Sequence, residues 1–182
     1  MKEKTDIAWP PGQLIHDEET VRQAIRAQAR ELRPRLSGRD PLALVLMQGA
    51  LYYAAWLTVA LDMPLEMDYI HASRYGDGRE GGGLRWLRRP PASVAGRTVL
   101  LLDDIYDEGE TLLAARTACE AADAEDVITA VLARKARRDA AGYRPDSVAL
   151  EVPNRFVVGC GLDCGGHWRN LPGIYALEDA KP

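Results

Sequence analysis

Three aspartates and a glycine follow a short apolar run, and they are the residues of this sequence best suited to chemistry. The apolar run spans residues 98–102, with Asp103 and Asp104 directly after it, then Asp107 and Gly109. Short apolar runs bounded by turn residues are typical of buried parallel strands. Ligands of open α/β sheets bind beyond the carboxyl ends of strands, where helix N-termini offer free N–H groups to anions. Carboxylates suit sugar hydroxyls and hard cations such as Mg²⁺, and a glycine loop suits phosphate, so the segment predicts a site for a ribose phosphate.

The two adjacent aspartates also predict where the strand ends. Successive residues of a strand point to opposite faces, so a strand that continued through Asp103 and Asp104 would bury one carboxylate. We therefore expect the strand to end at solvent after Leu102; an acidic strand end that binds nothing is the alternative. Farther along, Gly109 permits a positive φ and a close backbone approach, and the Thr111 hydroxyl can donate a hydrogen bond. This loop is suited to phosphate.

Apolar runs alternate with helical patterns along the rest of the chain, and these elements must position the acidic segment. The expected helices span residues 17–33, 51–61 and 112–122, and the expected strands span residues 41–47, 65–71, 98–102, 127–132 and 148–150. Strands that alternate with helices are typical of an α/β domain with a mainly parallel sheet. Residues 73–91 are rich in glycine and charge, and we expect either a mobile loop or a two-stranded excursion there.

The bulk properties set limits on the class of protein. A chain of 182 residues suits one domain, and 47% hydrophobic and 27% charged residues are ordinary for a globular protein. No apolar stretch approaches the ~20 residues of a membrane span. The net charge of −4 argues against nucleic acid as the main partner. The three cysteines are an odd number in a chain without a secretion signal, so we expect reduced thiols and a cytoplasmic protein.

Residues 97–112 closely resemble the phosphoribosyl pyrophosphate (PRPP) signature of type I phosphoribosyltransferases. The resemblance implies that Asp103 and Asp104 bind the ribose hydroxyls and the Mg²⁺ that accompanies PRPP. It implies that Asp107 is the general base at the purine N7; a cap for the following helix is the alternative role. The implied loop for the 5′-phosphate consists of Glu108, Gly109, Glu110 and Thr111. Glu108 departs from the commonest family pattern, which has threonine at this position.

A second segment, residues 46–55, resembles the pyrophosphate loop of the purine salvage enzymes. These enzymes often carry a non-proline cis peptide there, and the resemblance assigns Gln48 and Gly49 to pyrophosphate. Gln48 stands where some members carry lysine. The family also closes a flexible loop over the reacting centre, and the matching residues here are Arg74 and Tyr75. A solvent-exposed loop without this role is the alternative.

The segments from residue 132 to residue 169 resemble the carboxy-terminal half of hypoxanthine-guanine phosphoribosyltransferases. By this resemblance Lys135 donates to the purine 6-oxo group, Phe156 stacks on the base and Val157 offers its backbone to the base edge. An ammonium donor prefers a 6-oxo to a 6-amino purine, because the latter would set a donor against a donor. The resemblance also lets Asp163 hold Mg²⁺ or the exocyclic edge of the base, and lets Arg169 meet pyrophosphate.

The resemblance covers residues 42–177 and implies the fold and the reaction. We expect a single domain over residues 1–182 with a mainly parallel central sheet flanked by helices. Its core would span about residues 40–150, with a small hood formed by residues 151–182 and the N-terminal segment. The implied enzyme converts hypoxanthine or guanine and PRPP into the nucleoside monophosphate and pyrophosphate with Mg²⁺, as a homodimer or homotetramer. The alternatives are a xanthine, adenine or pyrimidine enzyme of this fold, a PRPP- or nucleotide-sensing regulator, and a purely structural homologue.

Overall fold

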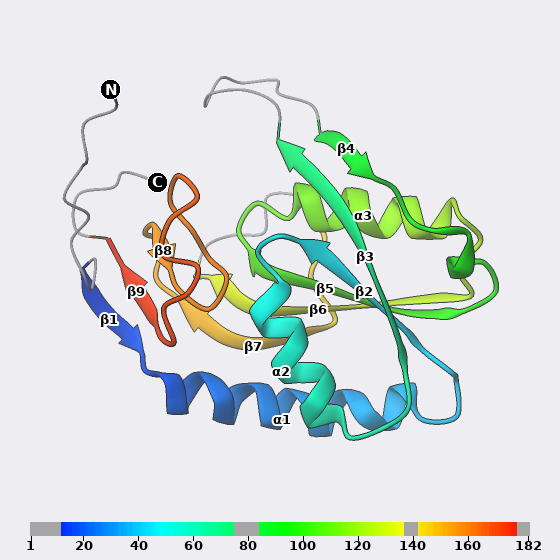
Figure 1. Ribbon diagram of the computed structural model, residues 1–182, viewed down its shortest axis with the longest axis horizontal. Coiled ribbons are helices and arrows are strands. Elements are labelled where there is room, and N and C mark those ends of the chain that lie inside the picture. The colour runs from blue at the N-terminus through cyan, green and yellow to red at the C-terminus, as the bar shows by residue number, and fades with distance from the viewer. Residues whose placement is uncertain (1–11, 75–83, 137–141, 178–182) are drawn as a thin grey trace.

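A six-stranded sheet forms the centre of the molecule in the computed structural model, which describes residues 12–74, 84–136 and 142–177 (Figure 1). Its strand order is β4-β3-β2-β5-β6-β7. Every neighbouring pair is parallel except β3 and β4, which are antiparallel. The strands are β2 (Leu42–Met47), β3 (Glu66–Arg74), β4 (Leu84–Arg88), β5 (Thr98–Tyr106), β6 (Asp126–Lys135) and β7 (Ser147–Val152).

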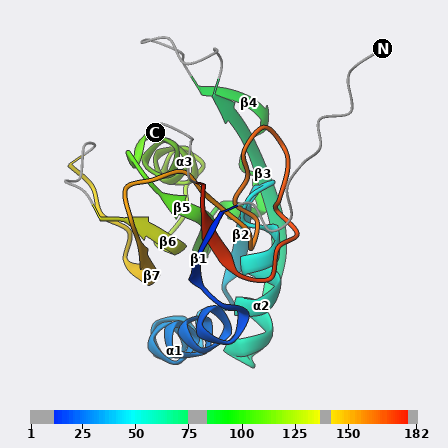
Figure 2. The same ribbon diagram turned by 90° about the vertical axis from the view of Figure 1, so that its left-hand side faces the viewer.

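Helices cover both faces of this sheet, which explains the continuous apolar runs of its strands (Figure 2). Helices α1 (Glu18–Leu36) and α2 (Leu51–Leu61) pack on one face, and α3 (Glu110–Glu120) and the short 3-10 helix η1 (Ala92–Val94) pack on the other. Along β5, Leu100 and Leu102 join the core under α1 and α2, whereas Val99 and Leu101 join the core under α3. This alternation of faces is the ordinary side-chain period of a strand.

A second, three-stranded sheet forms the hood from the two ends of the chain. Its order is β1-β9-β8, with β1 (Gln13–His16) and β8 (Val157–Val158) both antiparallel to β9 (Ile174–Ala176). In Figure 1 these strands lie together beside the carboxyl ends of the central strands. The predicted fold class, a mainly parallel sheet flanked by helices with a small hood from the termini, is confirmed.

The predicted end of the acidic strand was wrong. β5 does not stop at Leu102 but continues to Tyr106, because β6 stays paired with it as far as Tyr106↔Arg134. On its other side the pairing with β2 ends at Val45↔Leu102. The last residues of β5 therefore have a partner on one edge only, and this open edge is where Asp103 and Asp104 lie.

The glycine-rich excursion is two-stranded in its described part, as one of the two predicted alternatives had it. β3 runs on to Arg74 and β4 returns antiparallel to it, with Arg74 opposite Leu84. Residues 75–83 lie outside the described residues. The Arg88 guanidinium stacks on the Tyr69 ring at 4.0 Å and reaches the Asp68 carboxylate at 2.8 Å. These contacts hold β4 against β3 at the edge of the sheet.

Candidate active site

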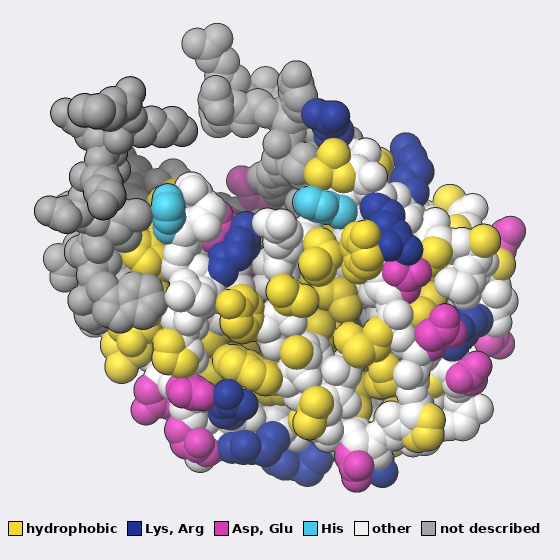
Figure 3. All heavy atoms as spheres, in the orientation of Figure 1, with side chains coloured by type: hydrophobic (Ala, Val, Ile, Leu, Met, Phe, Trp, Pro, Cys, Tyr) yellow, Lys and Arg dark blue, Asp and Glu magenta, His cyan; other side chains and the backbone are white. Residues whose placement is uncertain are grey.

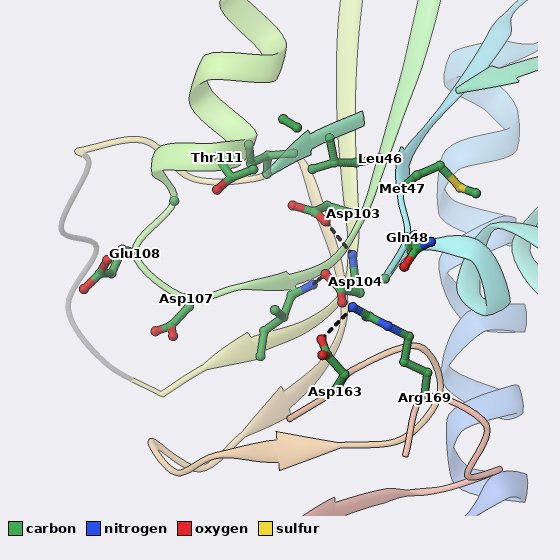
Figure 4. A pocket seen from close by; sticks show the side chains of 15 residues that line it. Leu46, Met47, Gln48, Asp103, Asp104, Asp107, Glu108, Thr111, Asp163 and Arg169 are labelled. Atoms are coloured by element: carbon green, nitrogen blue, oxygen red, sulfur yellow. Dashed lines mark hydrogen bonds and ion pairs between the residues drawn. The ribbon is translucent and has the colours of Figure 1, made fainter. Parts of the chain in front are cut away.

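A polar cavity of about 320 Å³ lies beyond the carboxyl ends of β2 and β5, where the sequence predicted a ligand site (Figure 4). β2, β5, the start of α3 and the hood all contribute to its walls. Ten of the predicted catalytic, ribose, phosphate, pyrophosphate and metal residues line it: Gln48, Gly49, Asp103, Asp104, Asp107, Glu108, Gly109, Thr111, Asp163 and Arg169. Parallel strands bring these residues together although they are distant in the sequence.

The Asp103 and Asp104 carboxylates lie on the open edge of β5. Asp103 is only 6% exposed, and its Oδ1 accepts the Asp104 backbone N–H at 2.9 Å. Burial, followed by the charge of Asp104, raises the pKa of Asp103 well above the ordinary value. Burial also raises the pKa of Asp104, and the positive charge of Arg169 is among the influences that oppose this rise. Two neighbouring carboxylates that are buried together favour a positively charged ligand.

Two glycines allow the loop after β2 to approach these carboxylates. A Cβ on Gly49 would lie 1.9 Å from the Asp104 Oδ2, so a side chain at this position would collide with the acidic pair. A Cβ on Gly161, which has φ +106°, would lie 1.9 Å from the Gly49 carbonyl oxygen. The peptide between Met47 and Gln48 is cis, as the family resemblance implied. The hood, the loop after β2 and the end of β5 thus meet in close contact.

The loop between β5 and α3 has the shape of an anion site. Gly109 is the N-cap residue of α3 and has φ +83°, and no side chain caps the helix. Gly109, and not Asp107, therefore occupies the N-cap position of α3. Thr111 lines the cavity in the first turn of the helix, whereas Glu110 is exposed. In Figure 4 the Glu108 side chain points outward from the loop. The backbone N–H groups at the start of α3 and the Thr111 hydroxyl can therefore bind an anion.

A second cavity, of about 130 Å³, adjoins the first and is lined by the predicted purine residues. Lys135, Phe156 and Val157 form its far wall, and the two cavities share Asp104, Ile105, Asp107 and Asp163. Lys135 is only 7% exposed, so its ammonium group is not a solvated surface charge. Its Nζ lies 2.8 Å from the Asp107 Oδ2 and 5.7 Å from the centroid of the Phe156 ring.

The Asp163 carboxylate is held by groups of the hood. Its Oδ1 lies 2.7 Å from the Arg169 Nη2, and its Oδ2 accepts the Gly166 backbone N–H at 2.7 Å. Arg169 also donates through Nη1 to the Gly161 carbonyl at 2.5 Å. The guanidinium is therefore fixed over the acidic end of β5, where it faces the first cavity.

The donor set suits a magnesium ion that is bound together with a phosphorylated ligand. Among residues 12–74, 84–136 and 142–177 no group of three or more His, Cys, Asp or Glu side chains could hold a metal ion without other ligands. Mg²⁺ commonly takes only one or two protein carboxylates and completes its shell with waters and substrate phosphates. The buried, mutually repelling Asp103 and Asp104 fit this arrangement.

Some of the predicted site residues are not placed, and other residues were not predicted. Arg74 is the last residue of β3, and Tyr75 lies outside the described part of the chain. Ile105 lines both cavities, and Tyr106 lies buried beneath the Gly109 loop; neither was assigned a role from the sequence. The sequence contained one signal for Tyr106, since a large aromatic side chain at the end of an apolar strand is usually buried.

Comparisons with known proteins show the family of the chain. Residues 13–164 match the phosphoribosyl transferase domain family. The chain is 32% identical over 91% of its length to the hypoxanthine-guanine phosphoribosyltransferase of Aquifex aeolicus, of which it covers 94%, and 33% identical to that of Bacillus subtilis, of which it covers 93%. It is 36% identical to the bifunctional protein TilS/HprT of Listeria innocua but spans only 26% of that protein.

Solved structures agree as well. The chain superposes with a TM-score of 0.84 on the hypoxanthine phosphoribosyltransferase of Trypanosoma cruzi, at 28% identity and with 93% and 96% of the two chains covered. The family model covers more than half of the chain, and the Aquifex relative is matched over nearly its whole length. The chain therefore belongs to the phosphoribosyltransferase family and, within it, to the hypoxanthine-guanine phosphoribosyltransferases.

Proposed function

We propose that this protein transfers the 5-phosphoribosyl group from PRPP to hypoxanthine or guanine in purine salvage, giving IMP or GMP and pyrophosphate. The proposal rests on the observation that the two cavities adjoin each other. One has the carboxylates and the glycine loop that a ribose phosphate needs, the other has the lysine and the aromatic face that a 6-oxopurine needs, and Asp107 borders both.

The first cavity supplies separate groups for the three parts of PRPP. The backbone N–H groups at the start of α3 and the Thr111 hydroxyl receive the 5′-phosphate, while the outward direction of Glu108 removes one negative charge from its path. Asp103 and Asp104 hold the ribose hydroxyls. Arg169 and the backbone around Gln48 and Gly49 receive the pyrophosphate; this backbone includes the cis peptide. When bound, Mg²⁺ would neutralise the leaving pyrophosphate, and the carboxylates of Asp103 and Asp104 would hold it.

The second cavity reads one edge of the base. O6 and N7 lie side by side on this edge of a purine, and a 6-oxopurine protonated at N7 presents an acceptor beside a donor. Lys135 and Asp107 present the complementary donor and acceptor 2.8 Å apart. A base that enters this cavity replaces the contact between the two side chains with one hydrogen bond to each. Phe156 stacks on the base, and the Val157 backbone contacts its edge.

The reaction then needs one proton acceptor and a dry site. The bond from the ribose C1′ to the pyrophosphate oxygen breaks and its electron pair leaves with pyrophosphate, while N9 of the base forms the new bond to C1′. Asp107 takes the proton from N7. The nearby carboxylates favour a transition state with oxocarbenium character. Arg74 and Tyr75, at the head of the excursion, are proposed to close over the site and exclude water.

Particular contacts in the structure argue against the alternative functions. The buried Lys135 beside Asp107 disfavours adenine and pyrimidines, but it separates xanthine from guanine poorly. A regulator that binds nucleic acid needs a basic face. Four arginines of α1 are each paired with a carboxylate, namely Arg22 with Glu18, Arg26 with Glu19, Arg33 with Asp62 and Arg35 with Asp146. In a purely structural homologue the buried Lys135–Asp107 pair would have no function.

No helix in the described residues is long and apolar enough to cross a membrane, and the cytoplasmic location stays a prediction.

We further propose that the protein pairs with a second copy of itself through one apolar face (Figure 3). Helix α2 carries no charged side chain, although part of it lies at the surface, and a helix that is apolar all round is normally buried. Six of the seven exposed large hydrophobic side chains of the described residues belong to α2, β3 and β4: Leu51, Tyr52, Val59, Met67, Tyr69 and Leu87. A contiguous patch of this kind marks a protein interface.

The oligomer is tested by charge substitution on this face. Val59 is 81% exposed and Met67 is 49% exposed, so the double substitution Val59→Asp and Met67→Asp leaves the monomer core intact. We expect it to halve the mass measured by sedimentation, because the substituted face joins one pair of copies. Leu14→Asp, at a 48% exposed residue of the hood, is the matched control. A monomeric wild type would refute the proposal.

The activity itself is tested by a Mg²⁺-dependent assay with PRPP in which hypoxanthine, guanine, xanthine and adenine are offered separately. Wild type should turn over hypoxanthine or guanine and reject adenine, and Asp107→Asn should lower kcat by about 100-fold or more. Turnover of xanthine alone would show that the protein is a xanthine-preferring phosphoribosyltransferase instead. Binding of PRPP without turnover of any purine would refute the enzyme and favour the regulator.

A further inference from the structure

Tyr106 is a buried residue behind the phosphate loop, and it has no part in the functions described so far. It is the last residue of β5 and only 2% of it is exposed. A Cβ on Gly109 would lie 2.6 Å from Cε2 of the Tyr106 ring and 2.7 Å from its hydroxyl oxygen. The ring edge therefore fills the space directly under the left-handed turn that opens α3.

The Tyr106 hydroxyl ties this loop to a second segment of the chain. It donates to the backbone carbonyl of Tyr143, in the connection that leads to β7. The Tyr143 hydroxyl lies 2.5 Å from the Thr129 Oγ1 and accepts from the Arg116 Nη1 at 3.3 Å. Thr129 belongs to the buried part of β6, and Arg116 belongs to α3. The carbonyl that Tyr106 uses is thus fixed to the sheet and to the helix that follows the loop.

We propose that Tyr106 is a positioning residue for the 5′-phosphate of PRPP. Its ring supports Gly109 and its hydroxyl anchors the end of β5, so the loop already has the shape in which its N–H groups receive an anion before the ligand arrives. A preformed loop binds phosphate without the entropic cost of ordering it. The inference rests on the proposed function, and it adds a residue that touches neither substrate.

Two substitutions separate the two contributions of the side chain. Tyr106→Phe keeps the ring under Gly109 and removes the hydroxyl, whereas Tyr106→Leu removes the ring as well. Tyr106→Phe should raise the KM for PRPP about fivefold, the factor expected for one buried hydrogen bond, while the KM for hypoxanthine stays within about twofold. Tyr106→Leu should raise the KM for PRPP further. The Kd of GMP, measured by titration calorimetry, should rise by the same factors, because GMP carries the same 5′-phosphate.

Tyr53→Phe is the matched control, because Tyr53 is fully buried in α2 and its hydroxyl donates to the Gln28 Oε1 at 2.8 Å. It should lower the melting temperature as Tyr106→Phe does without changing the KM for PRPP. Equal rises in both KM values, or a lower melting temperature with unchanged binding of PRPP and GMP, would overturn the role of Tyr106. Inactive wild type would instead refute the proposed function, and GMP titration would still test Tyr106.

Discussion

Lys135→Met removes the ammonium group of the base pocket and keeps most of the apolar stem. In the structure this ammonium is buried and lies 2.8 Å from the Asp107 carboxylate, above the plane of Phe156. The Asp107 side chain is 37% exposed, so water can hydrate its carboxylate after the substitution. The cost to folding should therefore be small, about 1 kcal/mol or less.

The cost to base recognition should be larger, because the lost interaction is a charge-assisted hydrogen bond to the 6-oxo group. Such bonds contribute about 1.5–3 kcal/mol, which corresponds to a rise of about 10- to 150-fold in the KM for hypoxanthine. The KM for PRPP should change little. The preference for hypoxanthine over adenine should fall by a similar factor, because the donor that repelled the 6-amino group is gone.

Steady-state kinetics with hypoxanthine and adenine at saturating PRPP measure both effects. Arg134→Met is the matched control, since Arg134 is the preceding residue of β6 and pairs outside the pocket with Glu151 at 2.5 Å. It should leave both KM values unchanged. If Lys135→Met raised the KM for PRPP as much as the KM for hypoxanthine, or left the adenine preference unchanged, the assignment of Lys135 to the base would be wrong.

Three further predictions concern the two cavities. Gly49→Ala places a Cβ within 1.9 Å of the Asp104 carboxylate, so we expect a loss of about 1–3 kcal/mol in the free energy of unfolding and at least a tenfold lower kcat/KM for PRPP. Asp103 has a raised pKa, and a carboxyl of this kind destabilises the folded state as the pH rises from the unfolded value of 3.8 through the raised value. Asp103→Asn should therefore raise the melting temperature of the ligand-free protein at about pH 7.5, by a difference that shrinks toward about pH 4, and abolish turnover; a lower melting temperature at about pH 7.5 would contradict this. Phe156→Leu removes the aromatic face and should raise the KM for hypoxanthine about tenfold, with the KM for PRPP as the internal control.

The local features of the site could be predicted from the sequence because local chemistry determines them. A buried strand, a turn glycine and a following helix are each encoded within a few residues, and Gly109 does open α3 with a positive φ. The end of β5 could not be predicted in this way. Its length depends on β6, which stays paired with it, and on β2, which ends earlier. Nothing between residues 98 and 112 records the length of those neighbours.

Contacts between distant segments could not be predicted from the sequence either. Lys135 and Asp107 are 28 positions apart, and their pairing depends on β6 running beside β5 in a register that brings both side chains to the same cavity. The apolar sequence of α2 predicts a helix, but it does not tell whether the core or a second copy of the chain covers each face. The family resemblance supplied roles for single residues, and the fold supplied their contacts.

The contact between Gly49 and Gly161 links the two halves of the proposed reaction. Gly161 belongs to the hood, together with Asp163 and Arg169, whereas Gly49 belongs to the loop after β2. A shift of the hood by the width of one methyl group would move Arg169 away from the acidic pair and change the shape of both cavities. Each half of the site therefore depends on the position of the other. It follows that substitutions in the hood should alter the KM for PRPP as well as the KM for the base.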